Sequence, residues 1–309
     1  MPPKGIYIIK ADGTRELFDR EKLLRSLRKI GTDKETADMI VQKIESDLTE
    51  EGHTTKEIYR QAFTLLRKHQ RPVALRYSLK RAIAELGPSG FPFEKFVAEI
   101  FKAQGYQTFT DQIVLGTCVP HEIDVVAFND KELIMTEAKF HTDFGAHSDL
   151  KVALYIKARF EDLQNTVFKF GGKERKLTRG MLITNTNFSS TAIQYGECVH
   201  LNMVGWNYPH DKNLHHLIEG LNLVPLTVLT TLNQSEKKMF LANDIVLSKQ
   251  LGDFGLLKSY GFDDLKAQSV IKEVYDLCKE CVGPDELAQI NKKAETSLNI
   301  KPENNESIL

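Results

Sequence analysis

The sequence predicts an α+β protein with several domains, and three observations lead to that prediction. The chain has 309 residues, which suffices for two or three domains of ordinary size. Two apolar, β-branched runs, at 123–128 and 133–136, predict neighbouring antiparallel strands. Apolar residues at helical spacing occur on both sides of them. We therefore expect a β-hairpin with a helical bundle, a central α/β unit with a mixed sheet flanked by helices, and a small helical C-terminal region.

Residues 1–88 are expected to form the first domain. The stretches 6–10 and 14–18 read as a hairpin, because Asp12-Gly13 between them is a strong turn pair. Asp19 then stands where a helix N-cap belongs. Apolar spacing predicts three further helices, over 34–48, 55–68 and 73–86. Gly87-Pro88-Ser89-Gly90 follows as a linker.

The stretch from His121 to Lys139 carries the clearest chemical signal. Side chains alternate between the faces of a strand, so Glu137 and Lys139 point the same way. Charges in an apolar strand are costly to desolvate and occur mainly where they pair or hold a metal. Asp124 on the preceding strand adds a second carboxylate, and carboxylates are ligands of the kind that Mg²⁺ takes. A lysine beside them could orient the attacking water, so the set suits metal-assisted hydrolysis of a phosphodiester.

Asp124, a gap and Glu137-Ala138-Lys139 resemble the PD-(D/E)xK nuclease signature, and their surroundings resemble the Mrr-like restriction endonucleases. The resemblance implies that Asp124, Glu137 and the Ala138 carbonyl bind Mg²⁺ or Mn²⁺. It implies that Lys139 positions the nucleophile. Glu94, on a helix expected over 93–101, matches a glutamate that joins the metal site in this family. Ile123 replaces the proline of the family's Pro-Asp pair and leaves the carboxylate intact.

The first domain resembles the ATP-cone, a nucleotide-sensing module of ribonucleotide reductases and of their transcriptional repressor. The matching residues are Ile9-Lys10-x-Asp12-Gly13, Glu16, Phe18, Asp19, Lys22 and Thr55-x-x-Ile58-Tyr59. The resemblance implies that the domain binds ATP or dATP, with Lys10 and Lys22 on the phosphates and Glu16, Thr55 and Tyr59 near ribose and base. Ala11 stands where the family has an arginine, which removes one cationic contact. The alternative is a structural domain whose lysines are solvated.

Three features are candidates for contact with nucleic acid. A helix expected over 148–167 presents Lys151, Tyr155 and Arg159 on a face that could lie along the backbone. A basic run from Lys169 to Arg179 fits a mobile phosphate-binding loop and an ordinary solvated loop equally well. At the end of a predicted strand, where sites gather in α/β sheets, stand Asn185, Thr186 and Asn187.

The C-terminal part is expected to be helical over 211–283 and disordered over 284–309. The turn at 257–262 faintly resembles a helix-hairpin-helix DNA-backbone binder. A helical region that packs on the nuclease core or on a second copy is at least as good an interpretation. Cys278 and Cys281 could form half of a zinc site or a redox couple, but no second pair completes a zinc site, so two reduced thiols are favoured.

Composition limits the function classes only coarsely. The net charge is −1, so any nucleic-acid surface must be a local patch. The four cysteines are sparse, and no stretch resembles a signal peptide or a membrane span, so we expect a soluble, cytoplasmic protein with no membrane partner.

We expect residues 89–210 to be a metal-dependent DNA endonuclease domain, regulated by nucleotide bound to residues 1–88. In the cell, such an endonuclease would serve in restriction or in defence against foreign DNA. The family and the need to cut two strands imply a homodimer or a nucleotide-dependent homo-oligomer. A non-catalytic nucleotide-sensing regulator and an RNA nuclease remain alternatives, because phosphate contacts to RNA and DNA look alike in sequence.

Overall fold

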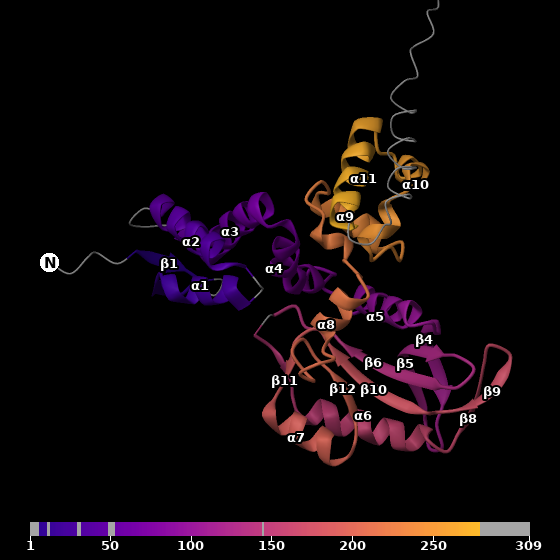
Figure 1. Ribbon diagram of the computed structural model, residues 1–309. Coiled ribbons are helices and arrows are strands. Elements are labelled where there is room, and N and C mark those ends of the chain that lie inside the picture. Colours follow the sequence, from indigo (N-terminus) through magenta and orange to yellow (C-terminus); the bar gives the residue numbers. More distant parts are fainter. Residues whose placement is uncertain (1–5, 11–12, 30–31, 49–52, 144, 279–309) are drawn as a thin grey trace, which may run out of the picture.

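The fold class is confirmed: small sheets and helices alternate along the chain as a multidomain α+β protein (Figure 1). The computed structural model describes residues 6–10, 13–29, 32–48, 53–143 and 145–278. The tail predicted at 284–309, Cys281 and the Asp12 turn residue lie outside these ranges. Within the ranges, no helix has the length and apolar character needed to cross a membrane.

The first domain is a small mixed sheet packed on helices. Its strands are β1 (Tyr7–Ile9), β2 (Arg15–Leu17) and β3 (His53–Thr54). β1 pairs antiparallel with β2 and parallel with β3, a two-residue strand that the sequence did not predict. The helices are α1 (Arg20–Lys29), α2 (Lys34–Asp47), α3 (Thr55–His69) and α4 (Arg71–Ala84). Thr54 and Glu57 form a reciprocal capping box, which fixes where α3 begins.

The central sheet has the strand order β12-β10-β6-β5-β4. Its strands are β4 (Gln107–Leu115), β5 (Pro120–Phe128), β6 (Leu133–Lys139), β10 (Arg179–Thr184) and β12 (Asn202–Val204). β5 runs antiparallel to β4 and β6, while β10 runs parallel to β6 and β12. β4 was not predicted, and it forms one edge of the sheet beside the strand that carries Asp124.

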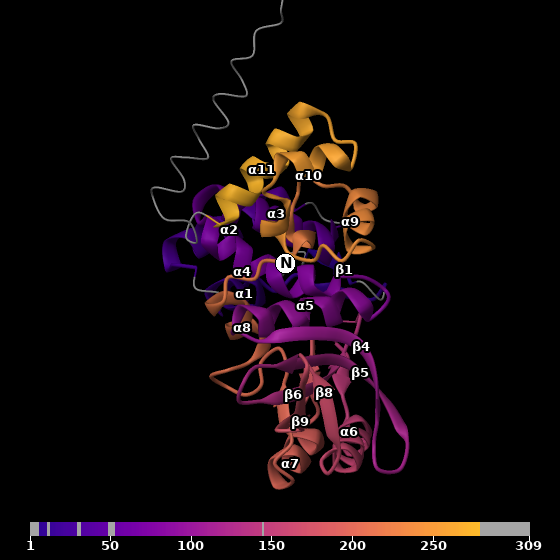
Figure 2. The same ribbon diagram turned by 90° about the vertical axis from the view of Figure 1, so that its right-hand side faces the viewer.

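Helices cover both faces of this sheet (Figures 1 and 2). α5 (Phe91–Ala103) lies on one face, while α6 (Leu150–Leu163) and α7 (Ser190–Cys198) lie on the other. Alternate residues of β5 follow this division: Val125 packs with the α5 side and Val126 with the α6 side. Burial on both sides explains why β5 and β6 are continuous apolar runs outside the charged positions.

The basic run is an ordered hairpin, not the mobile loop considered from the sequence. β8 (Val167–Phe170) pairs with β9 (Lys173–Lys176), and Val167 is exposed on β8 where a core-facing helix residue was expected. Cations of the run are engaged within the protein: Lys173 with Asp130, Arg179 with Glu132, and Arg175 with the Phe170 and Asn129 carbonyls. The hairpin adjoins the Phe128 end of β5, four residues or about 13 Å along the strand from Asp124.

The C-terminal region packs on α4 and α5 through the same apolar core as the sheet. Its elements are α8 (Leu214–Gly220), η1 (Leu226–Val228), α9 (Gln234–Leu241), η2 (Ser248–Leu251), α10 (Phe254–Ser259) and α11 (Asp264–Cys278). β7 (His147–Ser148) and β11 (Asn187–Phe188) belong to the central domain, where they form a separate two-stranded parallel sheet. The buried Thr227 hydroxyl donates to the Ala82 carbonyl of α4 at 2.6 Å. Of the interpretations left open, packing on this chain's own core is therefore the arrangement observed.

Candidate active site

The two motif carboxylates lie opposite each other on neighbouring strands. Val125 of β5 pairs with Thr136 of β6, so Asp124 and Glu137 occupy the next opposed positions. The Asp124 carboxylate accepts the Ala138 N–H at 2.7 Å, which fixes its position against β6. Burial, followed by the negative charge of Glu137, raises the pKa of Asp124 to about 7. The sheet thus brings the predicted pair together and leaves its negative charge poorly compensated.

Glu94 approaches the same place from the first turn of α5. Burial raises its pKa to about 8, and the charge of Asp124 and a hydrogen bond with Asp111, which favours the protonated Glu94, act in the same direction. The prediction from sequence that Glu94 belongs near Asp124 agrees with this electrostatic coupling. Its role at a metal stays a prediction.

Asp111 is a site residue that sequence reasoning missed. It lies in β4, whose pairing with β5 is interrupted at Asp111, and its φ is +55°. A left-handed backbone at a residue other than glycine is uncommon and is found at functional sites. Its side chain reaches Glu94. The signal available in the sequence was a lone aspartate in an alternating stretch, Gln107–Leu115, that was not interpreted as a strand.

Arg159 of α6 reaches into the site instead of lying along an outer face, as the sequence suggested. Its guanidinium forms an ion pair with Glu137, with side chains 10% and 18% exposed, and donates to the Glu122 carbonyl at 3.1 Å. It also lies over the Tyr155 ring and donates to the Tyr155 hydroxyl at 2.8 Å. Arg159 was given the wrong environment because helical periodicity does not show how far a long side chain reaches around its helix.

Lys139, the motif lysine, is exposed at the end of β6. The loop that follows it is clamped: Asn185 accepts the His141 N–H at 2.8 Å and donates to the His141 carbonyl at 2.7 Å. Asn185 is only 3% exposed, so it holds this loop to the end of β10 rather than facing substrate as predicted. Burial, with the charge of Lys139, lowers the pKa of His141, whose ring contacts Ser148.

His121 belongs to a separate structural contact. Its ring lies 2.8 Å from Asp162 of α6, which also accepts the Cys118 and Val119 N–H groups. These hydrogen bonds, with that from His121 the largest, lower the pKa of Asp162 to about 2. The contact ties the β4–β5 turn to the end of α6, so His121 serves the fold here.

The donor set fits a hard divalent cation. Glu94, Asp111, Asp124 and Glu137 supply carboxylate oxygens, and Arg159 is the cation paired with one of them. Burial first, and then the neighbouring carboxylates, raise the pKa of Asp124 and of Glu94, and a bound cation would favour their charged forms. Among the described residues, however, no three acidic, histidine or cysteine side chains already converge with the geometry of a metal site. A bound ion therefore requires side-chain rotation.

The predicted nucleotide residues of the first domain form an internally paired cluster. Glu16 lies between the two lysines, 2.6 Å from Lys10 and 3.0 Å from Lys22. The Thr55 hydroxyl donates to the Ile9 carbonyl, which joins α3 to β1. Tyr59 stacks on Phe63, and Arg81 lies over the Tyr59 ring. The fold thus gathers Lys10, Glu16 and Lys22 where the β1–β2 hairpin meets α1, and we call Lys10 and Lys22 the hairpin lysines. A triphosphate there would compete with Glu16 for both lysines.

The fold and these motifs correspond to known domain families. The ATP cone domain matches residues 6–85, a restriction endonuclease domain matches residues 87–207, and an AF1548-like C-terminal domain matches residues 225–278. The fusion expected from the sequence, an ATP-cone joined to a restriction endonuclease domain, is therefore confirmed. The C-terminal match also gives the helical region a family of its own.

The chain has relatives with the nuclease-like and C-terminal parts. An uncharacterized protein of Archaeoglobus fulgidus is 34% identical over 179 residues, which are 57% of this chain and 97% of the relative. The chain belongs to the family of that protein. The crystal structure of AF1548, a protein of unknown function, superposes with a TM-score of 0.51 at 31% identity, covering 61% of this chain and 98% of that one.

A more distant similarity carries no weight here. Can2 from Sulfobacillus thermosulfidooxidans, solved with cyclic tetra-adenylate, is 12% identical with a TM-score of 0.28, over 68% of this chain and 65% of that one.

Proposed function

We propose that this protein is a metal-dependent endonuclease that hydrolyses phosphodiester bonds in DNA under the control of ATP or dATP. The observation that supports it most is the opposed pair Asp124 and Glu137, with Lys139 two residues further along β6, inside a domain of the restriction endonuclease family. A sheet that binds nucleic acid without cleaving it has no need of two partly buried carboxylates whose negative charges repel each other.

Each site residue has a distinct role in this proposal. Asp124, Glu137 and the Ala138 carbonyl would hold Mg²⁺ or Mn²⁺, and Glu94 would support the metal or its water. The ion supplies polarisation of the phosphoryl oxygen and a lower pKa for the attacking water. Lys139 is exposed, so its ammonium can approach substrate and orient that water.

Regulation would pass through α4. Leu79 and Ile83 of α4, and Leu86 just after it, share one apolar core with α5 and the C-terminal region. Nucleotide on Lys10 and Lys22 would rearrange the Glu16 ion pairs at the other end of the domain. A change in the packing of α4 would then reach α5, which carries Glu94. A homodimer or nucleotide-dependent oligomer would allow both DNA strands to be cut.

A second candidate is a nucleotide-sensing regulator that binds nucleic acid without cleaving it. The observation in its favour is the Arg159–Glu137 ion pair, which neutralises one carboxylate of the site without a metal. An RNA nuclease keeps the same chemistry with another substrate, since phosphate contacts do not distinguish RNA from DNA.

Direct measurement of Mn²⁺ binding by electron paramagnetic resonance separates the first two candidates. We expect the wild type to bind Mn²⁺, and Asp124→Asn to weaken binding at least about tenfold. Asp130→Asn is the matched control, because Asp130 lies on the β5–β6 turn and pairs with Lys173 instead. Absence of Mn²⁺ binding by the wild type would favour the regulator.

A further inference from the structure

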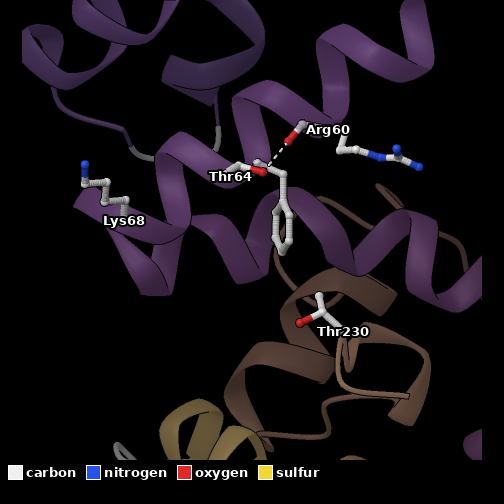
Figure 3. Close-up of a pocket in the computed structure, with 5 residues that line it drawn as sticks. Arg60, Thr64, Lys68 and Thr230 are labelled. Atoms are coloured by element: carbon white, nitrogen blue, oxygen red, sulfur yellow. Dashed lines mark hydrogen bonds between the residues drawn. The ribbon is translucent and has the colours of Figure 1, made fainter. Parts of the chain in front are cut away.

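A cavity of about 700 Å³ lies between the first domain and the C-terminal region, away from the carboxylates. Arg60, Phe63, Thr64 and Lys68 of α3 line one side, and Thr230, in the loop after η1, lines the other. Figure 3 shows Arg60, Thr64 and Lys68 along α3, with Thr230 on the segment that faces this helix. The volume is within the range of small-ligand sites, which are about 300–1,000 Å³.

Two cationic side chains line the cavity, Arg60 and Lys68. In the described part of the chain, neither Arg60 nor Lys68 forms an ion pair with a carboxylate. The lysines of the hairpin differ in this respect, since Lys10 and Lys22 both contact Glu16. Both cations of the cavity are exposed, so they remain available to an anionic ligand.

The opposite wall is held rigidly. Glu273 of α11 is buried, and its carboxylate accepts the Thr230 N–H at 3.0 Å, the Thr230 hydroxyl at 2.7 Å and the Thr231 N–H at 2.8 Å. These hydrogen bonds anchor the loop before α9 to α11. A ligand in the cavity would therefore touch two separately built units of the chain.

The spacing of the cations limits the ligand. Arg60 and Lys68 are eight residues apart on α3, or about 12 Å along its axis, and their side chains extend toward opposite ends of the cavity (Figure 3). One phosphate group does not meet both. Phosphates of a strand several nucleotides long do, with a base against the Phe63 ring, as in proteins that bind single strands through stacking and backbone contacts.

We propose that this cavity binds a short single-stranded oligonucleotide, with its phosphates on Arg60 and Lys68 and a base on Phe63, and that the bound strand bridges α3 and the Thr230 loop. This site is distinct from the hairpin lysines and from the carboxylate centre. It does not depend on the proposed cleavage chemistry.

The test is fluorescence anisotropy of the full chain with 5′-fluorescein-labelled hexathymidylate, in EDTA to prevent metal-dependent cleavage. We expect R60Q/K68Q to weaken binding at least tenfold. The slope of log affinity against log salt should become shallower by about 1.4, because about 0.7 is lost for each phosphate contact to a single strand. Phe63→Leu should weaken binding without altering that slope.

The matched control is R25Q/K34Q, which removes the same charge from α1 and α2 of the same domain and should change affinity less than threefold. Equal losses in both double variants, or no loss in R60Q/K68Q, would overturn the proposal. Calorimetric binding of ATP that depends on Arg60 and Lys68, without any binding of hexathymidylate, would also overturn it, because the ligand would then be a mononucleotide. The carboxylate-dependent Mn²⁺ test above stands or fails independently.

Discussion

At the scale of single residues, the site is defined by carboxylates that the fold keeps close together without enough positive charge. Burial and mutual repulsion raise the pKa of Asp124 to about 7 and that of Glu94 to about 8. Both carboxyls therefore hold a proton in the metal-free protein over a range where the unfolded chain has lost it. The protonation of these carboxyls should therefore affect both the free energy of unfolding and the binding of cations.

The first prediction concerns pH. Because the folded pKa values are raised, the stability that these carboxyls contribute is complete below pH 4 and is lost as pH rises through 7 to 8. In EDTA, the free energy of unfolding should therefore fall between about pH 4 and pH 8. The fall is at most about 1.4 kcal/mol per pH unit for each carboxyl that titrates. Partly exposed Glu94 contributes less than this limit, because solvent screens its charge. Urea unfolding across pH measures it.

Asp124→Asn should flatten this pH dependence, since the amide does not titrate. Mg²⁺ should flatten it in the wild type, because the ion favours the charged carboxylates. An unchanged slope in both Asp124→Asn and Glu94→Gln would show that these groups do not titrate as the structure indicates.

The second prediction concerns Arg159, which compensates Glu137 in the absence of metal. Arg159→Met should lower stability by about 3 kcal/mol, near the low end for loss of one partner from a buried pair. The double variant E137Q/R159M should recover part of this loss, because no unpaired charge remains. Urea unfolding of the wild type, Arg159→Met, Glu137→Gln and the double variant gives the coupling energy. Additive losses of stability would mean that the two side chains are not coupled.

At the scale of elements, the close contact between β10 and α6 sets the position of Arg159. A Cβ atom at Gly180 would lie 2.2 Å from the Phe160 ring, so α6 packs on β10 only because residue 180 lacks a side chain. Phe160 follows Arg159 directly. Displacement of this helix would move the guanidinium relative to Glu137.

Gly180→Ala should therefore destabilise the protein by about 1–3 kcal/mol, as overpacking of a core does. Gly220→Ala is the matched control, because Gly220 ends α8 with nothing within 4 Å of an added Cβ atom and should be neutral. Thermal unfolding of the two variants compares them. Equal melting temperatures would contradict the tight contact.

How far the sequence predicted the elements depended on the strength of local signals. The helices of the first domain and the motif strands were found because caps and long apolar patterns agree in them. β3 was missed because two residues carry no periodicity, and β4 because Gln107–Leu115 alternates weakly and leaves Ile113 exposed. The basic hairpin was misread because its ion pairs join it to a distant turn.

The site was predictable to a similar extent. Asp124, Glu137 and Lys139 lie on adjacent strands, so alternation alone placed them on one face. Glu94 came from a resemblance. Asp111 and Arg159 depend on strand pairing and helix packing across the sheet, and no local pattern reveals those. Asn185 was placed near substrate by its position after a strand, whereas its buried amide holds the His141 loop.

At the scale of the whole molecule, one apolar core joins α4, α5, the sheet and the C-terminal region. The first domain is thus attached to the nuclease-like domain through packed side chains as well as through the linker. The C-terminal region packs on both, and the cavity lined by Phe63 and Thr230 lies at this junction. A ligand at either of the two proposed sites would therefore act on the core that includes α5, the helix that carries Glu94.

Cleavage of supercoiled plasmid is the most direct test of the central proposal. The wild type, Glu137→Ala and the control Glu174→Ala, an exposed glutamate of β9, are compared with Mg²⁺ or Mn²⁺, with and without ATP or dATP. We expect metal-dependent cutting by the wild type and the control, at a rate that nucleotide alters, and at least about a hundredfold less by Glu137→Ala. Equal cutting by Glu137→Ala, or no cutting by the wild type under any of these conditions, would contradict it.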